Sequence, residues 1–342
     1  MLNKNENFFA GLDIGGSTVK SILVDQAGQQ AGDMIEAPSH VTDGFETTFS
    51  QLESALDSLA KNAGLSQTAI KGVGMDVPAP NSDGVIWKKS NLADDWMGRN
   101  IRDAFSNKIG LPVYMTNDCN AAAMGEFTIR GENKTGLLYV APGTGFGGGL
   151  VLPGGTLYEG ANGLALEPGH VALPFREEDG SLPKCACGLD GCIEAWVSLI
   201  ALRRRLKIEL SKDKWANHSF NNENTPIEKK AFQLRDLAEN NDALAVEIFK
   251  KQGYILGYAL ADLVRLFDPG LLVIGGGLAE TSFRDKYQEW VYEGFEEHGG
   301  GVDKGEGSSK NLNKQLTRIE WAKAGDSAGA LGMAFMAREL FR

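Results

Sequence analysis

Residues 8–25 read FFAGLDIGGSTVKSILVD, two apolar runs separated by a short turn that is rich in glycine and hydroxyl side chains. This pattern predicts strands at 8–14 and 19–25 that form a hairpin through the turn at 15–18. Residues 136–152 repeat the same order of strand, glycine-rich turn with a threonine, and strand. Because backbone N–H groups in such turns can approach phosphate oxygens closely, the repeat gives the chain two candidate phosphate-binding loops.

The rest of the chain alternates predicted strands with predicted helices. Apolar residues recur at helical spacing from Phe45 to Leu59. The sequence predicts further helices at 119–128, 193–208, 241–267 and 327–342, and further strands at 71–77, 112–117 and 271–274. Residues 298–313 lack periodicity and predict a mobile surface loop. Strands that alternate with helices indicate an α/β protein.

Composition argues against several classes of function. The chain has 342 residues, a net charge of −11 and a pI near 5.0, so it would repel the phosphates of a nucleic acid. Its longest apolar runs, such as 270–274, are far shorter than the roughly 20 residues that span a membrane. Residues 1–7 carry no apolar signal segment. Four cysteines suit a reducing compartment, and we expect a cytoplasmic protein.

The first turn offers several groups that suit a bound phosphate and its metal ion. Its glycines bring backbone N–H groups close to phosphate oxygens, its hydroxyls add donors, and Asp13 can hold a magnesium ion through water. Lys20 faces either these groups or away from them, depending on a one-residue register that the sequence leaves open. The residues assigned to this site are Asp13, Gly15, Gly16, Ser17, Thr18 and Lys20.

Two later glycine clusters extend the phosphate hypothesis. Residues 143–149 read GTGFGGG, and Thr144 and Gly145 would hold a polyphosphate from a second side. The third cluster consists of Gly275, Gly276 and Gly277. It follows a predicted buried strand and forms either the floor under a nucleoside or the tight start of a helix.

Asn117 and Asp118 stand where a predicted strand ends and a predicted helix begins, which is the usual place for ligand-facing groups in an open α/β sheet. Asp118 is therefore the candidate general base, which would accept a proton from a substrate hydroxyl as that hydroxyl attacks a γ-phosphate. The alternative is that Asp118 only caps the helix. Cys119 is expected to be a packed small residue.

A metal site is predicted between EPGH at 167–170 and CACGLDGCIE at 185–194. Three cysteines within eight residues, downstream of a histidine, have the ligand types and spacing of a closed tetrahedral zinc site. The alternatives are buried thiols or a disulfide, although the first two cysteines are too close in sequence to bridge comfortably. The predicted ligands are His170, Cys185, Cys187 and Cys192, and the same segments carry the carboxylates of Glu167 and Glu194.

Taken together, the motifs resemble those of the ROK family of bacterial sugar kinases and repressors. The resemblance rests on DIGGS at 13–17, NDCNAA at 117–122, GTGFGGG, EPGH and CACGLDGCIE, in this order along nearly the whole chain. It implies the actin-like, hexokinase-type α/β fold, with two domains and a cleft that closes on sugar and ATP. The implied smaller domain comprises residues 1–117 and 326–342, and the larger domain comprises residues 118–325.

The resemblance also implies roles for individual residues. Asp118 corresponds to the catalytic base, and the implied sugar contacts are Asn91, Asn117, Asp118, Glu167, His170 and Glu194. The zinc ion would be structural, with His170 and the three clustered cysteines as its ligands. The implied phosphate and magnesium elements are Asp13, Gly15, Gly16, Ser17, Thr144 and Gly145. A homodimer is expected.

The first loop departs from the usual pattern of the family, which is Gly-Gly-Thr-Lys. Here Ser17 and Thr18 follow the glycines and the lysine is displaced to Lys20. A lysine at this later place resembles the polyphosphate-using glucokinases, although those lack the cysteine cluster. ATP is the favoured donor because the glycines at 275–277 offer a nucleoside floor that polyphosphate would not need.

The sequence therefore predicts an ATP- and Mg²⁺-dependent sugar kinase, first of all a glucokinase that phosphorylates the 6-hydroxyl of glucose. N-acetylmannosamine and N-acetylglucosamine are alternative substrates, because the motifs do not separate them from glucose. A sugar-responsive repressor is less favoured, since such repressors carry a winged-helix domain ahead of the first loop and only twelve residues precede Asp13 here. The predicted sugar site also argues against a filament-forming scaffold.

Overall fold

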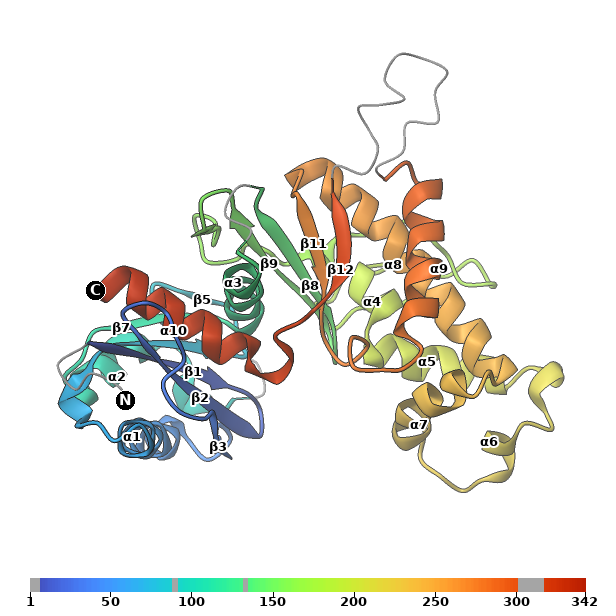
Figure 1. The fold of residues 1–342 in the computed structure, drawn as a ribbon. Coiled ribbons are helices and arrows are strands. Elements are labelled where there is room, and N and C mark those ends of the chain that lie inside the picture. Colours follow the sequence, from blue (N-terminus) through green and yellow to red (C-terminus); the bar gives the residue numbers. More distant parts are fainter. Residues whose placement is uncertain (1–6, 88–91, 132–134, 301–316) are drawn as a thin grey trace, which may run out of the picture. The chain divides into compact units, whose positions relative to one another are not determined.

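The computed structural model describes residues 7–87, 92–131, 135–300 and 317–342 (Figure 1). The chain divides into two compact units. The first unit comprises residues 1–139, 149–166 and 323–342, and the second comprises 140–148 and 167–322. The first unit therefore extends beyond the predicted smaller domain, and the predicted domain boundary at residue 117 stays a prediction.

The first unit is built on a five-stranded sheet with the strand order β3-β2-β1-β4-β7. Its strands are β1 (Phe8–Ile14), β2 (Thr18–Asp25), β3 (Ile35–Pro38), β4 (Ile70–Val77) and β7 (Val113–Asn117). β1 pairs antiparallel with β2, as the predicted hairpin requires, whereas β1, β4 and β7 are parallel. The carboxyl ends of these three strands therefore meet at one edge of the sheet, where open α/β sheets bind their ligands.

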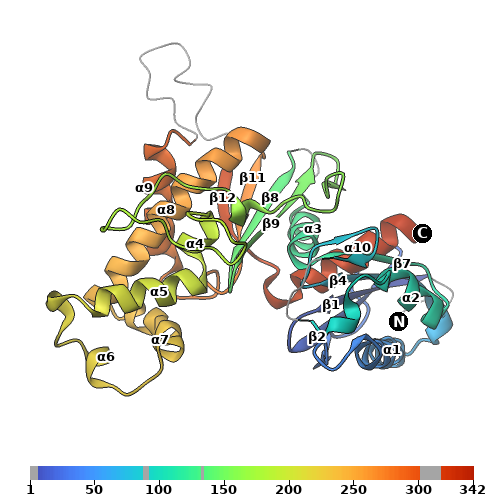
Figure 2. The ribbon, with the colours of Figure 1, turned by 180° about the vertical axis from the view of Figure 1, so that it is seen from behind.

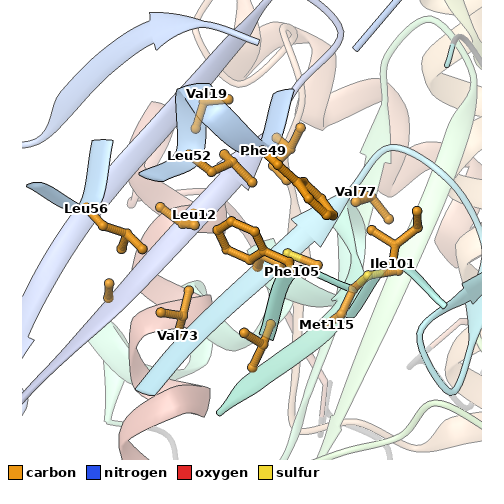
Figure 3. Close-up of a cluster of buried hydrophobic side chains, with 14 of the residues drawn as sticks. Leu12, Val19, Phe49, Leu52, Leu56, Val73, Val77, Ile101, Phe105 and Met115 are labelled. Carbon is orange, nitrogen blue, oxygen red and sulfur yellow. The ribbon is translucent and has the colours of Figure 1, made fainter. Parts of the chain in front are cut away.

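One face of this sheet packs against α1 (Phe45–Asn62) and α2 (Ile101–Ile109). Figure 3 shows this core, in which Leu12 of the sheet lies among Phe49 and Leu52 of α1 and Phe105 of α2. The predicted apolar stripe between Phe45 and Leu59 is the buried face of α1. Because strand side chains alternate between faces, the even-numbered residues of β1 enter this core.

The opposite face of the sheet carries α10 (Ala328–Phe341), the predicted last helix. The helix backbone lies directly against two strand glycines. A Cβ atom at Gly11 would lie 1.8 Å from the carbonyl oxygen of Ala330, and one at Gly74 would lie 2.1 Å from that of Met333. Only residues without a side chain allow this approach, so the two glycines fix how closely α10 packs on the sheet.

The helix α3 (Asp118–Arg130) follows β7 directly and packs along α10. Its buried Glu126 accepts hydrogen bonds from the backbone N–H groups of Lys323 and Ala324, at 2.7 and 2.6 Å, and pairs with Arg130 at 2.7 Å. This carboxylate fixes the segment that leads into α10.

The second five-stranded sheet has the order β10-β9-β8-β11-β12. Its strands are β8 (Leu137–Pro142), β9 (Phe146–Leu152), β10 (Thr156–Leu157), β11 (Leu271–Ile274) and β12 (Arg318–Trp321). β8, β9 and β11 agree with predicted strands. The remaining short elements are β5 (Asn81–Ser82), β6 (Val85–Ile86) and α6 (Ser219–Asn222), with 3-10 turns at Gln67–Ala69, Asp94–Trp96, Pro168–His170, Asp213–Trp215 and Gly325–Ser327.

Besides α6, the helices described in the second unit are α4 (Ile193–Val197), α5 (Leu199–Leu210), α7 (Ile227–Glu239), α8 (Ala243–Phe267) and α9 (Arg284–Glu297). α8 and α9 lie side by side in both views (Figures 1 and 2). The single helix predicted at 193–208 is wrong, because Ser198 adopts an extended conformation and caps α5 with a hydrogen bond from the N–H of Ala201. No helix of the described ranges is long and apolar enough to cross a membrane.

Candidate functional site

Three carboxylates gather at the carboxyl edge of the first sheet. Asp13 near the end of β1 is the register partner of Asp76 on the parallel strand β4. Asp118 directly follows β7, whose last residue, Asn117, is the register partner of Val77. Neighbouring strands are about 4.8 Å apart, so the register brings the first two side chains together on one face of the sheet.

These carboxylates repel one another. Asp76 is fully buried, and neither of its carboxylate oxygens makes a hydrogen bond of normal geometry with the described residues, although the N–H of Ile14 and the carboxyl group of Asp13 lie close to it. Burial first, and then the charges of Asp13 and Asp118, raise the pKa of Asp76 well above its usual range. Burial and the charge of Asp118 likewise raise the pKa of Asp13 to about 6. This part of the site therefore has an excess of negative charge that a cation would relieve.

Lys20 faces these carboxylates. It is the register partner of Asp13 in the β1–β2 hairpin, so both side chains lie on the same face of the sheet. Its ammonium group lies 3.0 Å from a carboxylate oxygen of Asp326, in the turn before α10, and its charge lowers the pKa of Asp13. The structure thus resolves the register that the sequence leaves open.

Asn117 and Asp118 have different roles at the start of α3. Asn117 is the N-cap residue, and its side-chain oxygen accepts a hydrogen bond from the N–H of Asn120 at 2.8 Å. Asp118 is exposed and accepts the N–H of Cys119 at 2.8 Å. The N-cap of α3 is therefore Asn117, while Asp118, which also binds a backbone N–H of the first turn of the helix, keeps an exposed side chain. Its role as the base stays a prediction. Although part of Asp118 is exposed, the surrounding protein removes water from its carboxylate, and this desolvation raises the pKa of Asp118. The carboxylate is therefore a better proton acceptor.

The first glycine turn, which includes Thr18 at the start of β2, closes through a hydrogen bond from the N–H of Gly15 to the carbonyl oxygen of Thr18, at 2.8 Å. Gly16 and Ser17 are exposed. A Cβ atom at Gly16 would find no atom within 4 Å, so there is free space above the turn. This geometry is compatible with the predicted phosphate loop.

The second glycine loop, between β8 and β9, is held by contacts with Glu194. The carboxylate of Glu194 accepts the N–H of Phe146 at 3.0 Å. A Cβ atom at Gly145 would lie 2.5 Å from the same carboxylate oxygen, so a larger residue would displace it. Thr144, at the tip of the loop, is exposed. Glu194 thus contacts the loop, a role that the sequence does not reveal.

The third glycine cluster lies beside the end of β8. The N–H of Gly275 donates to the carbonyl oxygen of Val140 at 2.8 Å, and a Cβ atom at Gly276 would lie 2.7 Å from the carbonyl oxygen of Pro142. Gly277 accepts a hydrogen bond from Arg235 at 3.1 Å. The alternative of a tight helix start is wrong, since turns follow these glycines and α9 begins only at Arg284.

The predicted metal ligands come together in the second unit. The ligand atoms of His170, Cys185, Cys187 and Cys192 all lie within 4.8 Å of one another. The Sγ atoms of Cys187 and Cys192 are 3.7 Å apart, and Nδ1 of His170 is 3.7 Å from Sγ of Cys185. Zn–S bonds of about 2.3 Å at tetrahedral angles give nearly this separation, so the residues fit a zinc ion.

Two carboxylates border this cysteine cluster. Oε1 of Glu194 lies 3.4 Å from Sγ of Cys185, and Oε2 of Glu167 lies 3.8 Å from Nε2 of His170. Burial, together with the charge of Glu194, raises the pKa of the Cys185 thiol. The thiolate form that metal binding needs is therefore unfavourable in this environment without a cation.

The predicted site residues fall into two groups. Asp13, the first turn, Lys20, Asn117 and Asp118 belong to the first unit, and the other described candidates belong to the second. Asn91 lies outside the described residues, as do positions 301–313 of the predicted mobile loop. Asp76 was missed. The signal that could have revealed it is a single acidic residue in strand 70–77, which is apolar apart from the exposed Lys71 near its start.

Comparisons with known proteins show which proteins this chain resembles. A family model described as "ROK family" matches residues 9–340. A glucokinase of Halalkalibacterium halodurans is 29% identical over 280 residues, which cover 81% of this chain and 82% of that protein. A putative xylose repressor of Caldicellulosiruptor sp. is 30% identical over 280 residues, which cover 80% of this chain and 67% of that protein.

A solved structure is also similar over nearly its full length. It is a glucokinase from Streptomyces griseus, crystallised with glucose and AMPPNP, and is 26% identical with a TM-score of 0.73. The alignment covers 97% of this chain and 100% of that chain. This likeness confirms the predicted actin-like, hexokinase-type fold class.

Proposed function

The chain belongs to the ROK family, and on that premise we propose that it is a sugar kinase that transfers the γ-phosphoryl group of ATP to the 6-hydroxyl of glucose. The observation that carries the proposal is the group of carboxylates at the carboxyl edge of the first sheet, beside an open glycine turn. A kinase of this type needs a proton acceptor and a place for phosphate with its metal ion, and this edge offers residues for both.

Asp118 is the proposed proton acceptor. Its exposed carboxylate can reach a substrate hydroxyl, and its raised pKa brings its basicity closer to neutral pH. It would take the proton of the 6-hydroxyl as the sugar oxygen attacks the γ-phosphorus. Asn117, Glu167, His170 and Glu194 remain the proposed sugar contacts.

The phosphates are assigned to the glycine turns. Backbone N–H groups of the first turn, with the hydroxyls of Ser17 and Thr18, would bind phosphate oxygens, and Thr144 would do so in the second loop. Asp13 would hold magnesium, which when bound neutralises phosphate charge. The buried carboxylate of Asp76 beside Asp13 supports this assignment, because it adds negative charge that a cation would offset.

We assign the cysteine cluster to a structural zinc ion, because four protein ligands leave no open position. With Nδ1 of His170 turned toward the cysteines, Nε2 is left on the side of Glu167. Glu194 contacts both Cys185 and the second glycine loop. Zinc would therefore order the loop as well as the proposed sugar contacts.

A coupled kinase assay tests the proposal. The purified protein is assayed with glucose, mannose, N-acetylglucosamine and N-acetylmannosamine, each with MgATP and with polyphosphate. We expect the highest kcat/KM with glucose and MgATP. A higher kcat/KM with an N-acetylhexosamine would correct the proposed substrate, and a higher kcat/KM with polyphosphate would correct the proposed donor. Either result would still support a sugar kinase.

No turnover with any sugar or donor would overturn the kinase proposal. Sugar binding without turnover would then favour a regulator, such as the repressor found among the relatives. A cytoplasmic location and a homodimer remain predictions, and light scattering of the purified protein tests the second.

A further inference from the structure

Asp76 is the one carboxylate of this edge that no sequence motif accounts for. It belongs to β4, where its neighbours Met75 and Val77 are buried and apolar. Its side chain has no exposed surface, and neither carboxylate oxygen makes a hydrogen bond of normal geometry with the described residues, although the N–H of Ile14 and the carboxyl group of Asp13 lie close to it. Burying a charged group without a partner is costly, so packing alone gives no reason for an aspartate here.

The groups that face Asp76 do not neutralise it. Asp13 on β1 and Asp118 at the start of α3 add negative charge. Among the described residues, the cation near Asp13 is Lys20 on β2, and it is paired at 3.0 Å with Asp326 in the turn before α10. Within the described part of the chain, the three carboxylates therefore share at most part of one ammonium charge. A divalent cation would neutralise this excess of negative charge.

We propose that Asp76, together with Asp13, is a carboxylate ligand of the divalent cation that accompanies the phosphoryl donor. The inference rests on the proposed kinase function and adds a ligand to its metal site. Magnesium is commonly held by one or two carboxylates together with waters and phosphate oxygens, and register partners on adjacent parallel strands supply two carboxylates from one side. Asp118, which is exposed, remains free to act as the base.

Binding of Mn²⁺ to the zinc-loaded protein, followed by electron paramagnetic resonance, tests this role without turnover. The titration is run on the protein alone and with a non-hydrolysable ATP analogue. We expect Asp76→Asn to raise the dissociation constant for Mn²⁺ at least about tenfold, the effect expected when a group that supports a metal is lost. Asp57→Asn removes the same charge from an exposed position on α1 and serves as the matched control.

A second variant and a kinetic measurement complete the test. Asp76→Ser removes the carboxylate without introducing an amide and is expected to weaken Mn²⁺ binding as much. At saturating ATP, both variants should need about tenfold more Mg²⁺ for half-maximal rate while the KM for sugar stays within twofold. Melting temperatures at or above that of the wild type show that the variants are folded.

Mn²⁺ affinities within twofold of the wild type in both folded variants would overturn the proposal, even if the protein phosphorylates glucose. Conversely, Mn²⁺ binding that depends on Asp76 in a protein without kinase activity would support the cation site and defeat the proposed function. The two failures are therefore distinguishable.

Discussion

Asp118 stands next to Asn117, yet the structure gives the two residues separate tasks. Because Asn117 caps α3, replacing Asp118 should not disturb the helix. We expect Asp118→Asn to lower kcat by about two to four orders of magnitude, the usual contribution of a general base, with glucose affinity nearly unchanged. Steady-state kinetics and calorimetric binding of glucose measure the two effects. A variant that keeps more than a tenth of wild-type kcat would contradict the assignment.

The pair of Lys20 and Asp326 offers a test of what the lysine does. If Lys20 attracts the donor, Lys20→Ala should raise the KM for ATP several-fold with a smaller effect on the KM for glucose. Asp326→Asn should act in the opposite direction, because it leaves the ammonium charge free for phosphate. Equal increases in both variants would mean that the ion pair only supports local structure.

At the residue scale, the sequence predicts groups that belong to motifs but not their partners. Asp13 and Asp118 were found because they stand beside glycines or at a strand end. Asp76 was missed, because its importance comes from its register partner on β1, a residue far away in the chain. Glu194 was placed near the metal ligands, but its contact with the second loop depends on tertiary structure.

At the scale of elements, the packing of α10 on the sheet depends on glycines. Gly74→Ala would place a methyl carbon about where the carbonyl group of Met333 now lies, so helix and strand would have to separate. We expect a loss of about 3 kcal/mol or more in the free energy of unfolding, at the upper end for overpacked sites. Gly143→Ala is the matched control, since a Cβ atom there meets no atom within 4 Å. Urea unfolding of both variants measures the difference, and equal stabilities would refute this account of the helix packing.

The cysteine cluster links η3 (Pro168–His170) to the start of α4, so loss of its ion should affect more than one element. Elemental analysis of the purified protein should find about one zinc per chain. Cys187→Ser is expected to lose the zinc and to bind glucose more weakly, because His170 and Glu194 lose a fixed neighbour. Active wild-type protein without zinc would refute the assignment.

Long helices with a clear apolar periodicity were predictable from the sequence. Short strands, and helices whose apolar positions alternate with many charged residues, were not. The sequence patterns gave α1, α3, α8 and α10 to within a few residues. β3 was missed because four residues carry too little pattern, and α9 was missed although Tyr287, Trp290, Val291 and Phe295 form its buried stripe. The charged residues between these positions hid the periodicity. The break at Ser198 was missed because apolar residues continue on both sides of it.

For the molecule as a whole, the carboxylates predict how stability depends on pH. The pKa of Asp13 rises from 3.8 to about 6 on folding, so the folded state binds more protons between these values. The contribution of this group to stability therefore falls as the pH rises from about 4 to 6. Because the pKa of Asp76 is raised in the folded state, Asp76→Asn should stabilise the protein at pH 7 and have little effect near pH 4.

Thermal or urea unfolding across this pH range, without Mg²⁺ and without a chelator that would strip zinc, measures the difference. Added Mg²⁺ should stabilise the wild type more than the variant. A variant that is less stable than the wild type at pH 7 would show that Asp76 is held by contacts that favour its charge.

The packing of α10 on the first sheet also has a consequence for synthesis on the ribosome. The sheet is complete in sequence at Asn117, whereas α10 begins only at Ala328. At about 5–20 residues per second, the ribosome needs on the order of ten to forty seconds to make the chain between them. During this time Phe9, Ile22 and Val24 have no helix to cover them. The nascent chain therefore exposes an apolar surface that chaperones can bind until α10 has been translated and covers it.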